Sequence, residues 1–139
     1  MTTEEKLLDA AQTLIKNQGL INFSMADIPR ACGLSRASCY QHFRDKNEVL
    51  AALCTNELLA NIKAVKSEQY HQVSGVFSMV LRPLIYNHLK DRDQLAIDHA
   101  FEEFLSCLDA LPDDPNFSFM KQGFNTLKNE RNQGKMNIV

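Results

Sequence analysis

The stretch from residue 24 to residue 46 constrains the fold most, because it contains two short helical patterns joined by a glycine. Ser24 is the expected N-cap of the first helix, whose apolar residues recur at helical spacing. Gly33 can adopt a positive φ without a Cβ clash, so the first helix is expected to end there. Ser35 is the expected N-cap of a second helix over residues 36–42. This arrangement predicts a helix-turn-helix whose second helix can enter the major groove of DNA.

The charge of this stretch is consistent with DNA binding. Arg30, Arg36, Arg44 and Lys46 stand against one acid, Asp45, in a chain whose net charge is −2. A locally basic strip on a slightly acidic protein is typical of a phosphate-binding surface. The alternative is that these charges only cover the solvated side of a small helical core.

Four segments carry a resemblance to a known family: Ser24-Met-Ala-Asp-Ile28, Ala31-Cys-Gly-Leu-Ser35, Tyr40-Gln-His-Phe43 and Lys46. They are similar to the amino-terminal signature of the TetR family of bacterial transcriptional regulators. The resemblance covers about residues 4–62, with a weaker match near residues 112–130. It implies an all-α fold with a three-helix helix-turn-helix head over residues 1–45. A small helical dimerisation and reduced effector-binding body would follow over residues 46–139.

The second helix supplies the candidate base-reading residues. Arg36 can bind guanine O6 and N7 in a bidentate way, and Gln41 is suited to adenine. Ala37 and Ser38 are small enough to let the helix approach base edges.

The phosphate-binding candidates come from the resemblance. Ser24, Tyr40, His42 and Lys46 match positions at which the family holds the DNA backbone, which fixes register without reading sequence. For His42 an alternative is a helix-terminal residue that helps to close the second helix.

Pro29 and Cys39 depart from the family pattern. Pro29 falls at about the fifth position of its expected helix, where proline costs about 3 kcal/mol, so a kink or a tightened first turn is expected. Cys39 stands where the family usually has leucine. It is interpreted as a small buried hydrophobic residue, with a redox pair between Cys39 and Cys32 as the alternative.

Apolar residues at helical spacing predict further helices over residues 4–17, 46–66, 73–89 and 94–110, and a last helix after Pro115. In the resemblance, the last two long helices pair with their copies across a two-fold axis. The expected dimer interface consists of Phe101, Phe104, Leu108, Phe117, Met120, Phe124 and Leu127. The alternative for these aromatic stripes is the chain's own core.

The chain has 139 residues, fewer than is common in the resembled family, and the middle of the body is where residues are expected to be missing. The effector chamber is therefore expected to be small or absent. If present, it would be a small apolar pocket walled by Phe77, Leu81, Phe101 and Phe104.

Several function classes find no support in the sequence. Four cysteines without a C-x-x-C pair fit a reducing cytoplasm, and neither a secretory signal nor a membrane-spanning apolar run is expected. A metal site is not expected, because His99 and Glu103 share a helix face but do not fill a coordination shell. No catalytic constellation or cofactor motif is recognised.

The sequence therefore predicts a cytoplasmic, homodimeric repressor that binds a palindromic operator in double-stranded DNA. A small apolar ligand could release it, although neither the sequence nor the resemblance identifies such an effector. The alternative is a dimerising interaction protein that scarcely binds DNA because Pro29 distorts its head.

Overall fold

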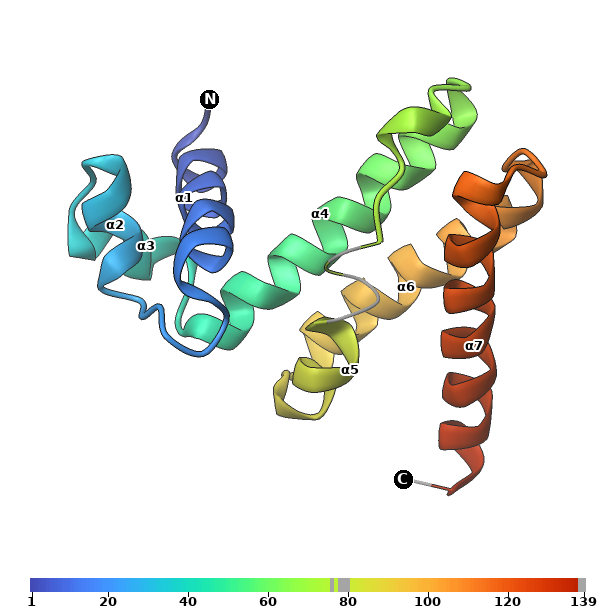
Figure 1. The fold of residues 1–139 in the computed structure, drawn as a ribbon. Helices are drawn as coiled ribbons and strands as arrows, with labels where there is room; N and C mark the ends of the chain where they lie inside the picture. The colour runs from blue at the N-terminus through green and yellow to red at the C-terminus, as the bar shows by residue number, and fades with distance from the viewer. Residues whose placement is uncertain (76, 78–80, 138–139) are drawn as a thin grey trace. The chain divides into compact units, whose positions relative to one another are not determined.

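The structure is a computed structural model, and it describes residues 1–75, 77 and 81–137. Over these residues every regular element is helical, which confirms the predicted all-α fold (Figure 1). The α-helices are α1 (Thr3–Gln18), α2 (Asp27–Cys32), α3 (Arg36–His42), α4 (Lys46–Lys66), α5 (Arg82–Ile85), α6 (Asp91–Cys107) and α7 (Pro115–Asn137). Short 3-10 helices are η1 (Tyr70–Gln72), η3 (Tyr86–His88) and η4 (Leu108–Ala110).

The chain divides into two compact units, Met1–Leu53 and Cys54–Val139. This division falls within α4, whereas the domain boundary expected from the sequence lies at the start of that helix. None of the described helices is both long enough and apolar enough to cross a membrane.

In the first unit, α1 packs against both α2 and α3. Helix α1 begins after Thr2, whose Oγ1 accepts a hydrogen bond from the backbone N–H of Glu5 at 3.1 Å. It ends at Gly19, which has a φ of 85°. Its buried face consists of Leu7, Leu8, Ala10, Ala11 and Leu14. This helix is the support on which the helix-turn-helix rests.

The start of α2 differs from the expectation that Ser24 caps it. The helix begins at Asp27, and the Asp27 carboxylate accepts hydrogen bonds from the Ser24 N–H at 2.8 Å and the Ser24 Oγ–H at 3.1 Å. The accepting oxygen therefore belongs to Asp27. Serine and aspartate are both strong capping residues, so the sequence alone does not show which of Ser24 and Asp27 supplies the accepting side-chain oxygen.

The later start of α2 explains how Pro29 is accommodated. Pro29 lies in the first turn of α2, where a backbone N–H has no acceptor within the helix. The preceding turn is tight, because Asp27 N donates to Ser24 O at 3.1 Å and Ile28 N donates to Met25 O at 3.3 Å. The expected tightened first turn is confirmed, and Pro29 deletes no bond inside α2.

The core of the second unit is built on α4, α6 and α7. Phe101, Phe104 and Phe124 are fully buried. The Phe104 and Phe124 rings meet edge to face with centroids 4.7 Å apart, and those of Phe101 and Phe124 lie 6.1 Å apart. Around them pack the buried residues Leu58, Ile62, Ala64, Val65, Val73, Ala100, Leu108 and Leu111.

The single helix expected over residues 73–89 is confirmed only in part, because residues 77 and 81 are π-helical and α5 and η3 cover residues 82–88, whereas residues 73–75 are not helical. Residues 76 and 78–80 lie outside the described part of the chain, so the continuity of a helix between residue 75 and α5 is not described. Two side chains of α4 bind the backbone at Ser74 and Phe77. Asn61 Oδ1 accepts from Ser74 N at 3.0 Å, and Asn61 Nδ2 donates to Ser74 O. Glu57 Oε2 accepts from Phe77 N at 3.1 Å.

Candidate nucleic-acid interface

The turn between α2 and α3 has the geometry that the sequence predicted. Gly33 adopts a left-handed conformation with φ 70° and ψ 24°, which ends α2. Ser35 then caps α3, because its Oγ accepts from the backbone N–H of Ser38 at 3.1 Å. The predicted bounds of the second helix, residues 36–42, are those observed. The local signals at Gly33 and Ser35 are sufficient to fix this motif.

Helix α3 has one buried face and one exposed face. Cys39 is fully buried, whereas Arg36, Ala37 and Gln41 are exposed. Ser38 is half-buried, and its hydroxyl is hydrogen-bonded to that of Ser35 at 3.1 Å. Three of the four predicted base-reading residues thus lie together on solvent-accessible helix surface, while Ser38 is engaged in the cap.

Arg36 is the most available cation of this surface. Its guanidinium lies over the Tyr40 ring, 5.7 Å from the centroid, and Tyr40 itself is 43% exposed. Among the residues that the structure describes, no acid forms an ion pair with Arg36. Its hydrogen-bonding fork is therefore available to a ligand.

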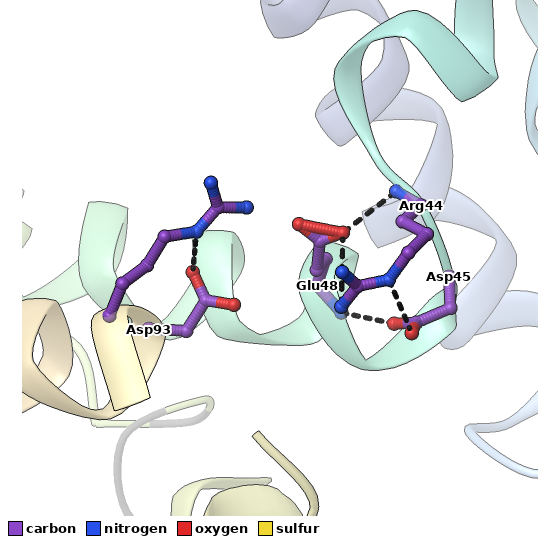
Figure 2. Close-up of polar contacts among 5 residues, drawn as sticks. Arg44, Asp45, Glu48 and Asp93 are labelled. Carbon is purple, nitrogen blue, oxygen red and sulfur yellow. Dashed lines mark hydrogen bonds and ion pairs between the residues drawn. The ribbon is translucent and has the colours of Figure 1, made fainter. Parts of the chain in front are cut away.

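Two other cations of the basic strip are paired with acids, which reduces the expected positive surface. Arg30 lies 3.8 Å from Asp27. Figure 2 shows Arg44 held between Asp45, at 3.5 Å, and Glu48, at 3.7 Å. The Glu48 carboxylate also accepts from the backbone N–H of Arg44 at 2.8 Å, so these residues fix the turn that leads into α4.

Lys46 is half-buried and points into the first unit. Its Nζ donates to Phe23 O at 2.8 Å and to Ile21 O at 3.5 Å, and it lies 4.1 Å from the centroid of the Phe23 ring. Loss of surrounding water lowers the pKa of this ammonium group, and the nearby Asp27 carboxylate opposes that shift.

The other phosphate-binding candidates lie on the outside of the unit. Tyr40 and His42 are exposed on α3. Ser24 is also exposed, but its hydroxyl already donates to Asp27. The hydrogen bond from the backbone N–H of Ser24 lowers the pKa of Asp27, and the bond from the Ser24 hydroxyl lowers it by a smaller amount.

Cys39 has the environment of a buried structural thiol. It is inaccessible to solvent, and burial, with a smaller effect of Cys32, raises its pKa. Cys32 is half-buried and donates its thiol hydrogen to Ile28 O at 3.3 Å. A raised pKa disfavours the reactive thiolate, so this geometry favours the structural interpretation over the redox pair.

The residues expected to line an effector pocket are mostly packed in the core of the second unit. Leu81, Phe101 and Phe104 are buried and Phe77 is half-buried. Sequence reasoning missed Arg82, which is 6% exposed and lies over the Phe101 ring at 4.6 Å. Its guanidinium pairs with Asp98 at 3.3 Å. Arg82 lies in α5 and Asp98 in α6, and no local sequence pattern indicates that these two residues meet.

The residues expected at a dimer interface show a similar pattern. Phe101, Phe104, Leu108 and Phe124 are buried within a single chain, which assigns them to its core instead of to an exposed surface. Phe117 is half-buried, and its ring meets that of Tyr70 edge to face at 6.3 Å. The side chains of Met120 and Leu127 lie outside the described part of the structure.

Glu103, which was considered as a metal ligand, and the nearby Asp98 have other partners. Asp98 accepts from the Tyr86 hydroxyl at 2.7 Å as well as binding Arg82, and Glu103 pairs with Lys66 at 3.5 Å. Within the described residues, His, Cys, Asp and Glu side chains form no group of three or more that could hold a metal ion.

Comparison with known proteins matches the first unit to a family. Residues 7–53 match the model of bacterial regulatory proteins of the tetR family. The chain is 32% identical over 118 residues to the HTH-type transcriptional regulator CymR of Pseudomonas putida, an alignment covering 83% of this chain and 54% of that protein. It is 30% identical over 89 residues to the HTH-type transcriptional regulator AcrR of Shigella flexneri, covering 63% of this chain and 40% of that protein.

The chain thus aligns with about half the length of these relatives, 54% of one and 40% of the other. The matched region contains α1, the helix-turn-helix of α2 and α3, and the start of α4. Through this region, the chain belongs to the tetR family of bacterial regulatory proteins.

Proposed function

We propose that this protein is a sequence-specific DNA-binding transcriptional regulator in which α3 enters the major groove. The observation that carries the proposal is the exposed face of α3. Arg36, Ala37 and Gln41 lie on it, while Cys39 fixes the opposite face in the core. Arg36 would read guanine and Gln41 adenine, and the small side chain of Ala37 would allow close approach. The relatives are named as transcriptional regulators, which supports this class over an enzyme.

The finer proposal is a homodimeric repressor that binds a palindromic operator. Two copies of α3 would occupy successive major grooves about one helical turn apart, so the operator would be an inverted repeat. Tyr40 and His42 would hold phosphates from the exposed surface of α3. A small apolar ligand that binds at Phe77 and Leu81 would release the DNA. Phe77 is half-buried, so such a ligand could contact it from solvent.

The pairing of Arg30 and Arg44 with acids predicts a modest salt dependence. Each phosphate neutralised by a cation contributes about −0.9 to the slope of log affinity against log salt. Because Arg36 is the cation of α3 without an acid partner in the described structure, we expect few such contacts for each subunit. Hydrogen bonds from neutral groups would supply the remaining backbone contacts.

The test is selection of bound DNA from a random pool, followed by titration of the selected site and of a scrambled site. Arg36→Ala should abolish most of the preference for the selected site, at a cost of about 1–3 kcal/mol. Lys16→Ala is the matched control, because it removes one exposed cation from the last turn of α1 in the same unit. It should leave the preference unchanged.

The second candidate function is a dimerising interaction protein with impaired DNA binding. If selection recovers no preferred sequence and the protein still sediments as a dimer, this alternative replaces the first. The placement of Pro29 in the first turn of α2, where it deletes no bond within the helix, supports the DNA-binding proposal.

A further inference from the structure

Lys46 occupies a position that is electrostatically unfavourable for a lysine. It is the first residue of α4, where the helix dipole presents partial positive charge. Its ammonium group is also partly withdrawn from water, which lowers its pKa. Both effects disfavour a charged lysine there, so the contacts it makes must offset them.

Those contacts are all made within the first unit. The Nζ group donates at 2.8 Å to the carbonyl of Phe23, a residue 23 positions earlier in the chain, and at 3.5 Å to that of Ile21. The Phe23 side chain is 2% exposed, and its ring centroid lies 4.1 Å from the same nitrogen. The ammonium group of Lys46 thus has two carbonyl acceptors and one aromatic ring as partners, which together offset its unfavourable position at the start of α4.

The loop bound by Lys46 leads directly into the helix-turn-helix. Phe23 is followed by Ser24, whose N–H and hydroxyl bind Asp27 at the start of α2. On its other side, Lys46 follows the turn that Arg44 and Glu48 fix after α3. Lys46 therefore connects the entry to α2 with the exit from α3.

We propose that Lys46 is a positioning residue for DNA recognition, which ties the start of α4 to the loop between α1 and α2 and so holds α3 at its reading angle. This role differs from the phosphate contact expected from the sequence. The effect of Lys46 on DNA recognition rests on the proposed DNA-binding function. The hydrogen bonds from Lys46 to the loop between α1 and α2 exist in the free protein, so they can be tested without DNA.

The first experiment measures hydrogen exchange in the free protein. Lys46→Met keeps most of the aliphatic stem but removes the charged donor, and Lys16→Met is the control on an exposed surface. Hydrogen bonds to charged groups are worth enough to change local opening about tenfold to a hundredfold. We expect Lys46→Met to speed exchange of the Ser24 and Asp27 amides by that factor, and Lys16→Met to leave both unchanged.

The second experiment measures binding to the selected and scrambled sites at several salt concentrations. A positioning residue predicts that Lys46→Met lowers the ratio of specific to scrambled binding while the salt slope stays constant. A phosphate contact predicts equal weakening of both sites and a slope smaller by about 1. Unchanged amide exchange together with a reduced slope would overturn the proposal.

A third measurement covers the case in which Lys46→Met does not fold. In the wild type, nitrogen NMR of the lysine ammonium groups should show Lys46 protected from solvent exchange in the free protein and still so after DNA is added. An ammonium signal that exchanges freely before DNA is added would contradict the tether. If the wild type selects no DNA sequence, the proposed function fails, yet the exchange measurements still decide whether Lys46 holds the loop.

Discussion

Replacing Asn61 with alanine tests whether its side chain holds the non-helical residues 73–75 that follow η1. Asn61 is 1% exposed and uses both ends of its amide on one residue, accepting from Ser74 N at 3.0 Å and donating to Ser74 O. The substitution removes both bonds and leaves two half-buried backbone groups without these partners.

The expected cost follows from these two bonds. Each intramolecular hydrogen bond contributes about 0.5–1.5 kcal/mol net, and a buried group left unpaired adds to the loss. Alanine is the better helix former by up to about 0.7 kcal/mol, which offsets part of it. We expect Asn61→Ala to lower the free energy of unfolding by about 1–3 kcal/mol.

The matched control is Asn56→Ala, which makes the same chemical change at an exposed position of the same helix. Urea unfolding followed by circular dichroism should shift the midpoint of Asn61→Ala downward on the order of 1 M relative to this control. Hydrogen exchange at the Ser74 amide should accelerate in the same variant. If the two variants unfold within about 0.5 kcal/mol of each other, hydrogen bonding by Asn61 does not hold the segment.

Three further predictions concern single sites. Gly33→Ala should destabilise the protein in thermal unfolding by about 1–2 kcal/mol, because the left-handed φ of 70° is strained for alanine although no heavy atom lies within 4 Å of the added Cβ. Hydrogen bonds from Ser24 lower the pKa of Asp27, so this carboxylate stabilises the fold above its unfolded pKa near 3.8 and ceases to as pH falls through the lower folded value. Asp27→Asn should therefore lose less stability on acidification than the wild type, as measured by unfolding at both ends of that range. Burial and the Glu57 carboxylate raise the pKa of Cys54 to about 12, so an alkylating pulse at about pH 8 should label Cys54, in peptide mass spectrometry, only when the second unit opens.

The elements that the sequence predicted well depend on residues close together in the chain. Helix α3 follows from Gly33 and Ser35, which act within one turn of the positions they control. The same local logic was insufficient at α2, because Ser24 and Asp27 can each act as donor or acceptor for the other. Only the geometry shows that Asp27 supplies the accepting oxygen.

The helix expected over residues 73–89 does not include its first three residues, and the reason is a different one. The apolar spacing extends over residues 73–75, but Asn61 binds the backbone of Ser74 at both its N–H and its C=O, which competes with a helix there, while Glu57 accepts from the N–H of the helical residue Phe77. Those partners lie 13 and 20 residues away in sequence, where periodicity carries no information about them. Arg82 and Asp98, 16 residues apart, were missed on the same grounds.

The candidate site was predicted at the level of helix faces, and less well at the level of individual charges. Counting cations along residues 30–46 gave a basic strip, because the nearest acids in sequence were not recognised as partners. The structure pairs Arg44 with Asp45 and Glu48 and places Lys46 on backbone carbonyls. Among the cations of this strip, the guanidinium of Arg36 is then the one that no acid of the described structure pairs with. Affinity for DNA would then depend less on total charge than on the placement of one arginine.

Helix α4 contributes residues to both units. Lys46 binds the carbonyls of Ile21 and Phe23 within the first unit, and Asn61 binds the backbone of Ser74 within the second. Hydrogen bonds are directional, so these bonds to backbone groups are sensitive to a shift of the helix. A ligand that altered the register of α4 in the second unit would therefore have to break a bond of Asn61 or carry the change along the helix to Lys46. Measuring exchange at the Ser24 amide in Asn61→Ala distinguishes these two outcomes when the increase exceeds that expected from the lower global stability of the variant.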